Sequence, residues 1–299
     1  MAFHASEYER FQGQRSGAPA WWPVFKATIT RGWSITWVRR ITMGSLFLSL
    51  AIIFGLYTLY KVVPGWRELL RQFGQFAGNA GDDIPWTIDA RFYAGLMNAF
   101  IYPVLLPLSV LFGQDLIASD IRTNALEAYF ARPLTPVGYL LGRSLAFIGF
   151  LLSATLAPLL FVWGFDVVTA PDNHFSEVSM VPGGMSLALF CVALTLALVV
   201  QAVTSLSKSP TWTNLGLIAA FVMSPPLAHI LHEITDNSAF LALSLPENIL
   251  VVCRHFMSLP IPKHSVLPLA EHALIAFGIL AATSLAVLAR RILRKGLVG

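Results

Sequence analysis

The sequence predicts an all-α integral membrane protein with six transmembrane helices. Of its 299 residues, 56% are hydrophobic and only 12% are charged, and the mean hydropathy is +0.67. A soluble globular domain has roughly 25% charged residues. Six apolar runs are each long enough to cross about 30 Å of hydrocarbon, and nearly all ionisable side chains lie between them or near their ends.

Residues 1–40 are expected to form a cytoplasmic tail followed by an amphipathic entry helix. Trp22, Phe25, Ile29, Trp33 and Trp37 recur every three or four residues and therefore share one helical face. A helix of this kind lies in the plane of the inner leaflet. The alternative is a polar tail that runs directly into the first span. The segment lacks the short apolar core of a removable signal peptide.

Residues 41–299 are expected to form the transmembrane domain. Its six predicted spans are Ile41–Tyr60, Tyr93–Phe112, Tyr139–Gly164, Met185–Leu206, Trp212–Leu231 and Ala270–Ala289. The candidates for lining a transport pathway are the polar side chains within these spans, namely Asn98, Tyr102, Gln201, Asn214 and Ser224. The alternative is that they form ordinary hydrogen bonds between helices, which contribute about 0.6 kcal/mol each on average.

The fifth span contains Ser224-Pro225-Pro226, and two prolines remove backbone donors and break or kink a helix. The segment 232–268 that follows is too apolar for a free loop, and its runs are too short to span. It is expected to form re-entrant or interfacial helices on the outer side. This region is rich in histidine, with His229, His232, His255, His264 and His272. One interpretation is a transition-metal site, and the other is a set of scattered surface histidines. No ligand spacing is diagnostic, so we predict no metal site.

The distribution of basic residues predicts the orientation. With six spans, the N-terminus, the loops after spans two and four and the C-terminus share one side, which holds 14 of the 20 basic residues but five of the 16 acidic residues. Lys and Arg concentrate on the cytoplasmic side of membrane proteins. Both termini are therefore predicted to be cytoplasmic. The basic residues border spans and match no groove-reading motif, so anionic lipid rather than nucleic acid is the expected counter-charge.

Segment 113–143, between spans two and three, is a polar island with a short predicted helix at Asn124–Phe130, followed by Arg132-Pro-Leu. Its charged side chains belong at or beyond a membrane surface. No Walker A loop, His-Glu-x-x-His helix or Gly-x-Ser-x-Gly elbow occurs in the chain, and we predict neither catalytic residues nor a cofactor site. The segment is expected to dock a partner through Asp115, Asp120, Arg122, Asn124, Glu127 and Arg132, with Lys208 contributing from the next loop on that side.

The island resembles the first cytoplasmic loop of ABC-2 type permeases, including the copper-processing and gliding-associated branches. In that family an acidic and basic turn precedes a short helix and an Arg-Pro-Leu step. Where members often have a glutamate-rich turn before Gly-Thr-Leu, this chain has Ser119-Asp-Ile-Arg-Thr-Asn-Ala-Leu126. The amphipathic entry helix, the six spans and the broken fifth span extend the resemblance to the whole chain.

The resemblance implies a type V exporter-like fold and the membrane half of an ATP-binding-cassette exporter in the bacterial cytoplasmic (inner) membrane. ATP and Mg²⁺ would then be bound by a separate ABC ATPase subunit in two copies, and this chain would not be an enzyme itself. A second copy of the permease or a paralogue, membrane lipid and an outer-side accessory protein are the other implied partners. Two alternatives stay open: an ATPase-linked membrane scaffold without solute transport, and a secondary transporter driven by an ion gradient.

Overall fold

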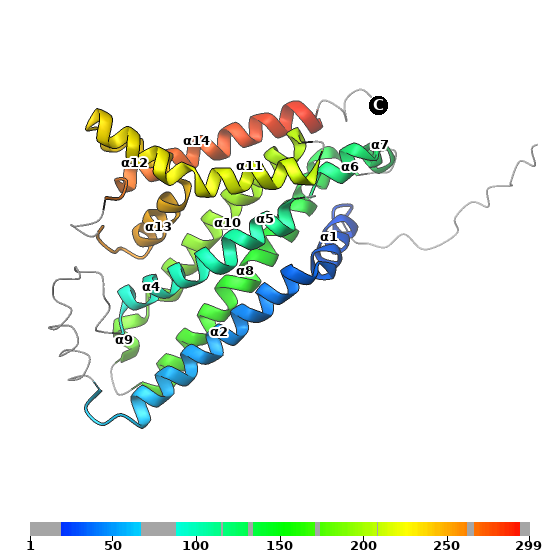
Figure 1. Cartoon of the computed structure of the whole chain (residues 1–299). Helices are drawn as coiled ribbons and strands as arrows, with labels where there is room; N and C mark the ends of the chain where they lie inside the picture. The colour runs from blue at the N-terminus through cyan, green and yellow to red at the C-terminus, as the bar shows by residue number, and fades with distance from the viewer. Residues whose placement is uncertain are drawn as a thin grey trace, which may run out of the picture.

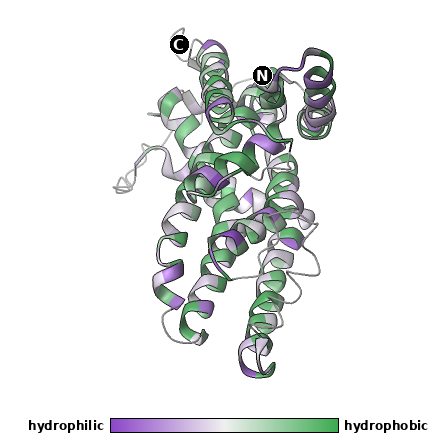
Figure 2. Cartoon of the chain, turned by 90° about the vertical axis from the view of Figure 1, so that its left-hand side faces the viewer, coloured by the Kyte–Doolittle hydropathy of each residue, from purple (hydrophilic) through white to green (hydrophobic). Residues whose placement is uncertain are grey.

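The computed structural model describes residues 19–66, 88–114, 116–130, 134–170, 174–207, 209–261 and 266–293. Helices account for most of these residues, and no strand occurs among them. The longest helices run roughly side by side in one elongated bundle (Figure 1). Apolar residues cover most of their length (Figure 2).

Five helical stretches in the described part of the chain are long and apolar enough to cross a membrane: Thr36–Lys61, Ala90–Arg122, Pro136–Thr169, His174–Leu206 and Ala270–Ile292. A sixth would be the bent pair α11 (Pro210–Val222) and α12 (Ser224–Thr235), if the two helices form one span. The chain is therefore an all-α, multi-pass membrane protein by helix length and composition. Five of the six predicted spans lie within these stretches, the second of them across a π-helix, and the fifth predicted span corresponds to the bent pair.

The centre of the bundle is α10 (Val181–Leu206), which packs against α8 (Pro136–Thr169), α13 (Leu245–Phe256) and α14 (Ala270–Leu288). In the stretch His174–Leu206, which contains α10, 67% of the most apolar 18-residue segment is buried within the chain. The corresponding share is 22% both for α2 (Thr36–Lys61) and for the stretch Ala270–Ile292, which contains α14. The two latter helices therefore keep broad apolar faces outward, as helices in contact with lipid or a second subunit do.

The entry helix α1 covers Trp22–Ser34 and is separated from α2 by a single extended residue, Ile35. The structure thus differs from the expectation that the entry helix reaches residue 40, because residues 36–40 are the first turns of α2. The face of α1 that packs against the bundle is not the aromatic face. Val24, Thr28 and Gly32 are buried, whereas the aromatic side chains Trp22, Trp33 and Trp37 are exposed.

Close packing explains why small residues form the buried face of α1. A Cβ atom at Gly142 of α8 would lie 2.8 Å from the backbone oxygen of Trp21 and 3.0 Å from the Cβ of Val24. Within α1 itself, a Cβ atom at Gly32 would lie 2.5 Å from the Phe112 ring. Helix α1 therefore contacts the bundle through backbone and small side chains, and its tryptophans remain outside.

The second predicted span contains a local change of helix type. It consists of α4 (Ala90–Phe100), a π-helix η1 (Ile101–Leu105) and α5 (Leu106–Gly113). The side chain of Asp89 caps α4 by accepting a 2.8 Å hydrogen bond from the backbone N of Arg91. Pro103 lies in η1, where its missing N–H interrupts regular α-helical bonding. Such π-segments often occur at functional sites.

The predicted break in the fifth apolar run is present. Helices α11 and α12 meet at Met223 with a bend of 41°, next to Pro225 and Pro226. After α12 the chain forms a 3₁₀-helix η2 (Ser238–Leu243) and then α13, whose residues Ile249, Val251 and Val252 are buried in the main core. The last helix α14 is followed directly by a π-helix η3 (Ala289–Leu293).

Short elements gather at the two ends of the bundle (Figure 1). One end, called here the α1 end, carries α1 and the two short helices α6 (Ala118–Arg122) and α7 (Ala125–Phe130). The opposite end, called the α13 end, carries α9 (His174–Val178), α12 and α13. Helix α8 joins the two ends, and Arg143 and Asp166 lie 23 residues apart along it, about 35 Å for an α-helix.

Candidate functional site

The predicted docking segment forms two short helices at the α1 end. Helices α6 and α7 are joined through Asn124, which has a left-handed φ of 54°, a conformation that Asn adopts more readily than most residues. The expected short helix at Asn124–Phe130 is therefore present from Ala125. The side chains of Arg122 and Asn124 are exposed. Asp115, Arg132, Lys208 and the Glu127 side chain lie outside the described part of the structure.

Asp120, expected at the docking surface, is buried with 6% of its surface exposed. Its carboxylate forms an ion pair with Nη2 of Arg143 on α8, and Oδ2 accepts a 2.6 Å hydrogen bond from the Tyr139 hydroxyl. Arg143 is 5% exposed, and its Nη1 donates to Oγ1 of Thr28 on α1 at 3.1 Å. The Asp120 side chain thus joins α6 to α8 and points away from solvent.

Further contacts make α1, α6, α7 and α8 one connected unit. Nη1 of Arg31 donates to Oγ of Ser119 at 3.0 Å. Val24 from α1, Leu126 from α7 and Tyr139 from α8 form a small buried cluster. A displacement of α6 and α7 would therefore act on α1 and α8 directly, because charge pairing, hydrogen bonds and apolar packing all connect them.

Two of the predicted pathway residues form interhelical hydrogen bonds near the α1 end. Nε2 of Gln201 donates to Oγ of Ser144 at 2.7 Å, and Nδ2 of Asn214 donates to Oε1 of Gln114 at 2.7 Å. The amide oxygens of Gln201 and Asn214 are buried without a hydrogen-bond partner among the described residues. These contacts fit the alternative given for such residues, while the two oxygens keep unused acceptor capacity.

The other three predicted pathway residues lie elsewhere, so the five do not converge on one site. Ser224, at the helix break, donates to the backbone oxygen of Ala220 at 2.6 Å and accepts from the backbone N of Leu245 at 3.1 Å. Tyr102 is 44% exposed on η1, and Asn98 is half-buried on α4. Ser224 therefore fastens the start of α13 to the break between α11 and α12.

A polar cluster near the helix break was not predicted. Nε2 of His229 lies 2.7 Å from Oε1 of Glu247, connecting α12 to α13. Buried polar atoms without a partner among the described residues are concentrated at this end: Oε2 of Glu247, Oγ of Ser244, Oδ1 of Asn248 and Nδ1 of His232 and His272. Ser244 and Glu247 have the spacing of a capping box, but Ser244 makes no side-chain cap and Glu247 turns to His229.

Among the described residues, no three His, Cys, Asp or Glu side chains group suitably for a metal ion, so the histidines between residues 229 and 272 do not form a metal site there. His264 lies outside that part. Cys191 and Cys253 are free thiols. Burial raises the pKa of the Cys253 thiol to about 12, so it remains protonated and packs as a small apolar group within α13.

A second buried carboxylate, also missed at the sequence level, lies at the α13 end. Asp166 is fully buried near the end of α8, although its position after an apolar run suggested the start of a loop. Its Oδ1 accepts from the Tyr60 hydroxyl of α2, and its Oδ2 accepts from the Tyr93 hydroxyl of α4 at 2.6 Å. Nε2 of His174 on α9 lies 2.9 Å from Oδ2. Asp166 thereby joins four helices.

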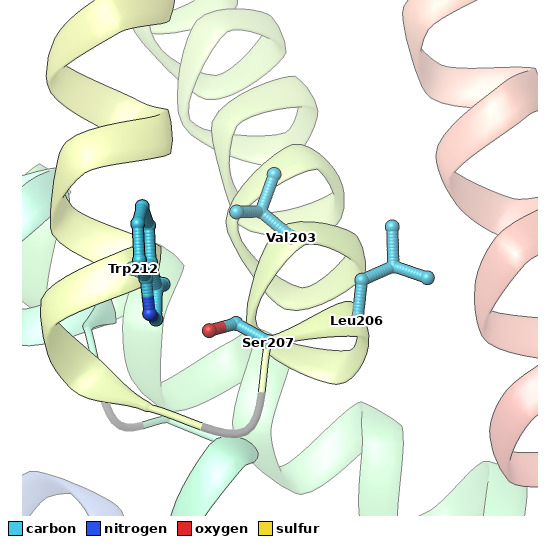
Figure 3. A pocket seen from close by; sticks show the side chains of 4 residues that line it. All are labelled: Val203, Leu206, Ser207 and Trp212. Atoms are coloured by element: carbon cyan, nitrogen blue, oxygen red, sulfur yellow. The ribbon is translucent and has the colours of Figure 1, made fainter.

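A shallow hollow of about 410 Å³ lies at the α1 end, where α10 turns into α11. Figure 3 shows Val203 and Ser207 at the end of α10 opposite the Trp212 ring of α11, with Leu206 directed to the other side. Trp212 is 72% exposed and Leu206 is 54% exposed. The hollow is apolar, open and adjacent to the loop that was predicted to contribute to docking.

No protein-family profile matches the chain, and no curated protein matches it significantly. What the chain does must therefore be inferred from its own side chains. The burial of Asp120 and Asp166 can be recognised only in the folded chain. The two tyrosine partners of Asp166, for example, are 106 and 73 residues away from it in the sequence. The only feature of the sequence that could have indicated this site is Asp166 itself, a single acidic residue two positions after a predicted span.

Proposed function

We propose that this chain is the transmembrane permease subunit of an ABC exporter of the ABC-2 class, driven by a separate ATPase subunit. The chain itself would supply no catalytic residue. ATP hydrolysis in two partner ATPase subunits would be converted by two permease chains into a change of access across the cytoplasmic membrane. In this assignment the α1 end faces the cytoplasm and the α13 end faces outward, in agreement with the positive-inside rule.

The observation that carries the proposal is the connection of α6 and α7 to the bundle. These helices leave the second candidate span, present Arg122 and Asn124 outward, and are joined to α8 and α1 through the buried Asp120 and Arg143 pair. A partner that pushes on α6 and α7 would therefore tilt α8 instead of only bending a loop. An ATPase subunit whose dimer closes on ATP is a partner that acts in this way.

The apolar hollow at Trp212 supports a second contact with the same partner. It borders the turn between α10 and α11 at the same end of the molecule as α6 and α7. Exposed aromatic side chains in shallow hollows are frequent anchors at protein interfaces. We assign Trp212 as the apolar anchor and Arg122 as the polar contact of the ATPase interface.

The test is recovery of an ATPase with the full-length chain from its native membrane. Mass spectrometry should identify a copurifying chain that carries a Walker A motif. The combined change Arg122→Glu and Trp212→Ala should lower its recovery at least tenfold, because both substitutions lie on the proposed interface. Arg91→Glu is the matched control, since Arg91 is an exposed base at the other end of the bundle.

Equal recovery with the interface variant and the control would contradict the docking assignment. Absence of any Walker A chain from all preparations would contradict the proposed class. If vesicles containing the reconstituted complex hydrolyse ATP but move none of the tested lipids, drugs or saccharides, the ATPase-linked scaffold becomes the better interpretation.

Ion-gradient-driven transport remains a second candidate, because of Asp166 and Glu247. Apart from Glu271 at the start of the sixth, the predicted spans contain no acidic residue, yet Asp166 belongs to the long helix α8 and is fully buried. Buried carboxylates in such helices are typical of proton pathways. Transport by vesicles that contain this chain alone, driven by a pH gradient and abolished by Asp166→Asn, would favour this candidate over the exporter.

A further inference from the structure

The start of α13 carries three buried oxygen atoms that have no hydrogen-bond partner among the described residues. They are Oγ of Ser244, Oε2 of Glu247 and Oδ1 of Asn248. Ser244 and Asn248 are 0% and 1% exposed, and 14% of the Glu247 side chain is exposed. Side chains three and four positions apart are neighbours at the start of a helix, so these three lie on one side of its first turn.

The other polar atoms of Glu247 and Asn248 are already occupied. Nδ2 of Asn248 donates to the backbone oxygen of Ala242 at 2.7 Å, and Oε1 of Glu247 lies 2.7 Å from Nε2 of His229. The atoms left over are therefore acceptors: a carboxylate oxygen, an amide oxygen and a hydroxyl oxygen. Leaving such atoms unpaired in the interior is costly. A water molecule donates only two hydrogen bonds, whereas a cation can contact all three oxygens.

The charge at this point is negative. Glu247 lies in the first turn of α13, where the helix dipole stabilises a carboxylate, and no lysine or arginine of the described part of the chain pairs with it. Of the elements packed against α13, α10, α11, α14 and η2 contain no lysine or arginine. Helix α4 contributes only Arg91, which is exposed, and Arg254 of α13 directs Nε and Nη2 to the backbone oxygen of Pro260. When His229 is neutral, the site therefore keeps a full negative charge, which a cation complements.

The site adjoins the break between α11 and α12. Oγ of Ser224 accepts from the backbone N of Leu245, so the break and the first turn of α13 are in direct contact. Because residues 225 and 226 are prolines, the backbone oxygens of Phe221 and Val222 lack the N–H groups that would pair with them in a regular helix. Carbonyl oxygens at broken membrane helices are recurrent ligands of Na⁺. The break therefore brings further oxygen acceptors to the same junction.

We propose that the junction of α12 and α13 binds a small monovalent cation such as Na⁺, through Oε2 of Glu247, Oδ1 of Asn248 and Oγ of Ser244. Divalent ions suit this set less well, because Ca²⁺ takes about six to eight oxygen ligands and Mg²⁺ keeps several of its waters. The site also differs from a transition-metal site, since no nitrogen ligand takes part. The bound ion would hold α13 against the break. Its binding does not rest on the proposed function, because it requires neither an ATPase nor transport.

The experiment measures saturable binding of radioactive Na⁺ to the purified full-length chain without an ATPase, with choline chloride keeping the ionic strength constant. Its failure is therefore distinguishable from failure of the proposed function. Glu247→Gln should weaken Na⁺ binding about tenfold or more, because it removes the full negative charge of the site and keeps an acceptor for His229. Glu233→Gln is the matched control, since Glu233 is an exposed acid on α12 outside the set of oxygens. It should change binding less than about twofold, because solvent and salt screen exposed charges.

A second variant separates ion binding from folding. The Oγ of Ser244 makes no hydrogen bond among the described residues, so Ser244→Ala should leave the chain at least as stable in choline buffer. The same variant should weaken Na⁺ binding about fivefold, because affinity for a hard cation depends on the number of oxygen ligands. Unfolding in SDS, recorded in choline and in Na⁺ buffer, should show a stabilisation by Na⁺ that is smaller in Ser244→Ala than in the wild type.

Absence of saturable Na⁺ binding to the wild-type chain would overturn the proposal and leave water as the partner of these oxygens. Equal losses for Glu247→Gln and Glu233→Gln would mean diffuse attraction and overturn it as well. Undiminished binding by Ser244→Ala would overturn the assignment of the three oxygens. Displacement of Na⁺ by Ca²⁺ at lower concentrations than by K⁺ would overturn the monovalent assignment. Displacement by methylammonium at lower concentrations than by K⁺ would overturn the choice of a metal ion in favour of an organic ammonium group.

Discussion

Asp120 and Asp166 are both buried aspartates that hold helices together at opposite ends of α8, yet they are stabilised differently. Asp120 faces the permanently charged Arg143, whereas Asp166 is surrounded by the hydroxyls of Tyr60 and Tyr93 and by His174, which is charged only when protonated. The α1 end therefore depends on charge matching, and the α13 end depends on hydrogen bonds. Replacing the aspartate by asparagine should therefore destabilise the α1 end much more than the α13 end.

The largest effect is expected at the α1 end. Asp120→Asn should lower the free energy of unfolding by about 3–5 kcal/mol, because it leaves Arg143 buried without a counter-charge. Unfolding in mixed micelles with increasing SDS, followed by tryptophan fluorescence, would measure it. The double change Asp120→Asn with Arg143→Gln should recover most of the loss. If the double variant is no more stable than Asp120→Asn, charge matching is not what stabilises this end.

At the α13 end the comparison rests on two substitutions of one residue. Asp166→Ala should cost about 3 kcal/mol, because two tyrosine hydroxyls lose their acceptor and each unsatisfied buried group costs about 1–3 kcal/mol. Asp166→Asn should cost less than about 1 kcal/mol, since the amide still hydrogen-bonds to its neighbours. The same unfolding assay applies. An Asn variant as unstable as the Ala variant would indicate that the carboxylate charge itself is required.

Close backbone contacts extend the comparison. Gly142→Ala should destabilise the fold by about 2 kcal/mol, as overpacking commonly does, because its Cβ would lie 2.8 Å from the Trp21 backbone oxygen. Gly184→Ala should have a similar effect at the other end, where the Phe256 backbone oxygen would lie at 2.6 Å. Only Gly142→Ala should also increase proteolytic cleavage around α1. Gly149→Ala, with no atom within 4 Å, is the neutral control.

The smallest effects concern single hydroxyls. Tyr93→Phe should cost about 1 kcal/mol, because Asp166 loses one of its neutral donors. Tyr139→Phe should cost less, since Asp120 keeps its ion pair with Arg143. Unfolding curves of the two variants, recorded in the same micelles, would give the order. The reverse order would mean that Arg143 does not satisfy Asp120 without the Tyr139 hydroxyl.

Composition and local patterns predicted the helical membrane class, a short helix at Asn124–Phe130, which the structure begins one residue later, and the break beside Pro225 and Pro226. These features depend on residues that are neighbours in the chain. The inward direction of Asp120 and the burial of Asp166 depend on partners as far as 106 residues away. Periodicity carries no information on such pairs, and an acid beside a span has the same local pattern whether it faces water or a tyrosine.

The same limit applies to α1. Its aromatic residues share a helical face, which favoured that face as the one in contact with the membrane, and these tryptophans are indeed exposed. The position of the helix, however, depends on Thr28, Gly32 and the opposing Gly142, which have no distinctive pattern. Small residues indicate a close approach between two helices only when the positions of both helices are known.

The π-helix at Ile101–Leu105 determines in which direction the side chains of the later residues of the second span point. A residue added to or taken from a helix rotates the later part by about 100° relative to the earlier part. Deleting one residue in η1 and restoring regular α-helix would leave Tyr93 against Asp166 but turn Phe112 and Gly113 away from α8. Helix α6 would then start from the wrong side, and Asp120 would no longer meet Arg143. The two ends of the molecule are thus kept in angular register by one irregular turn between them.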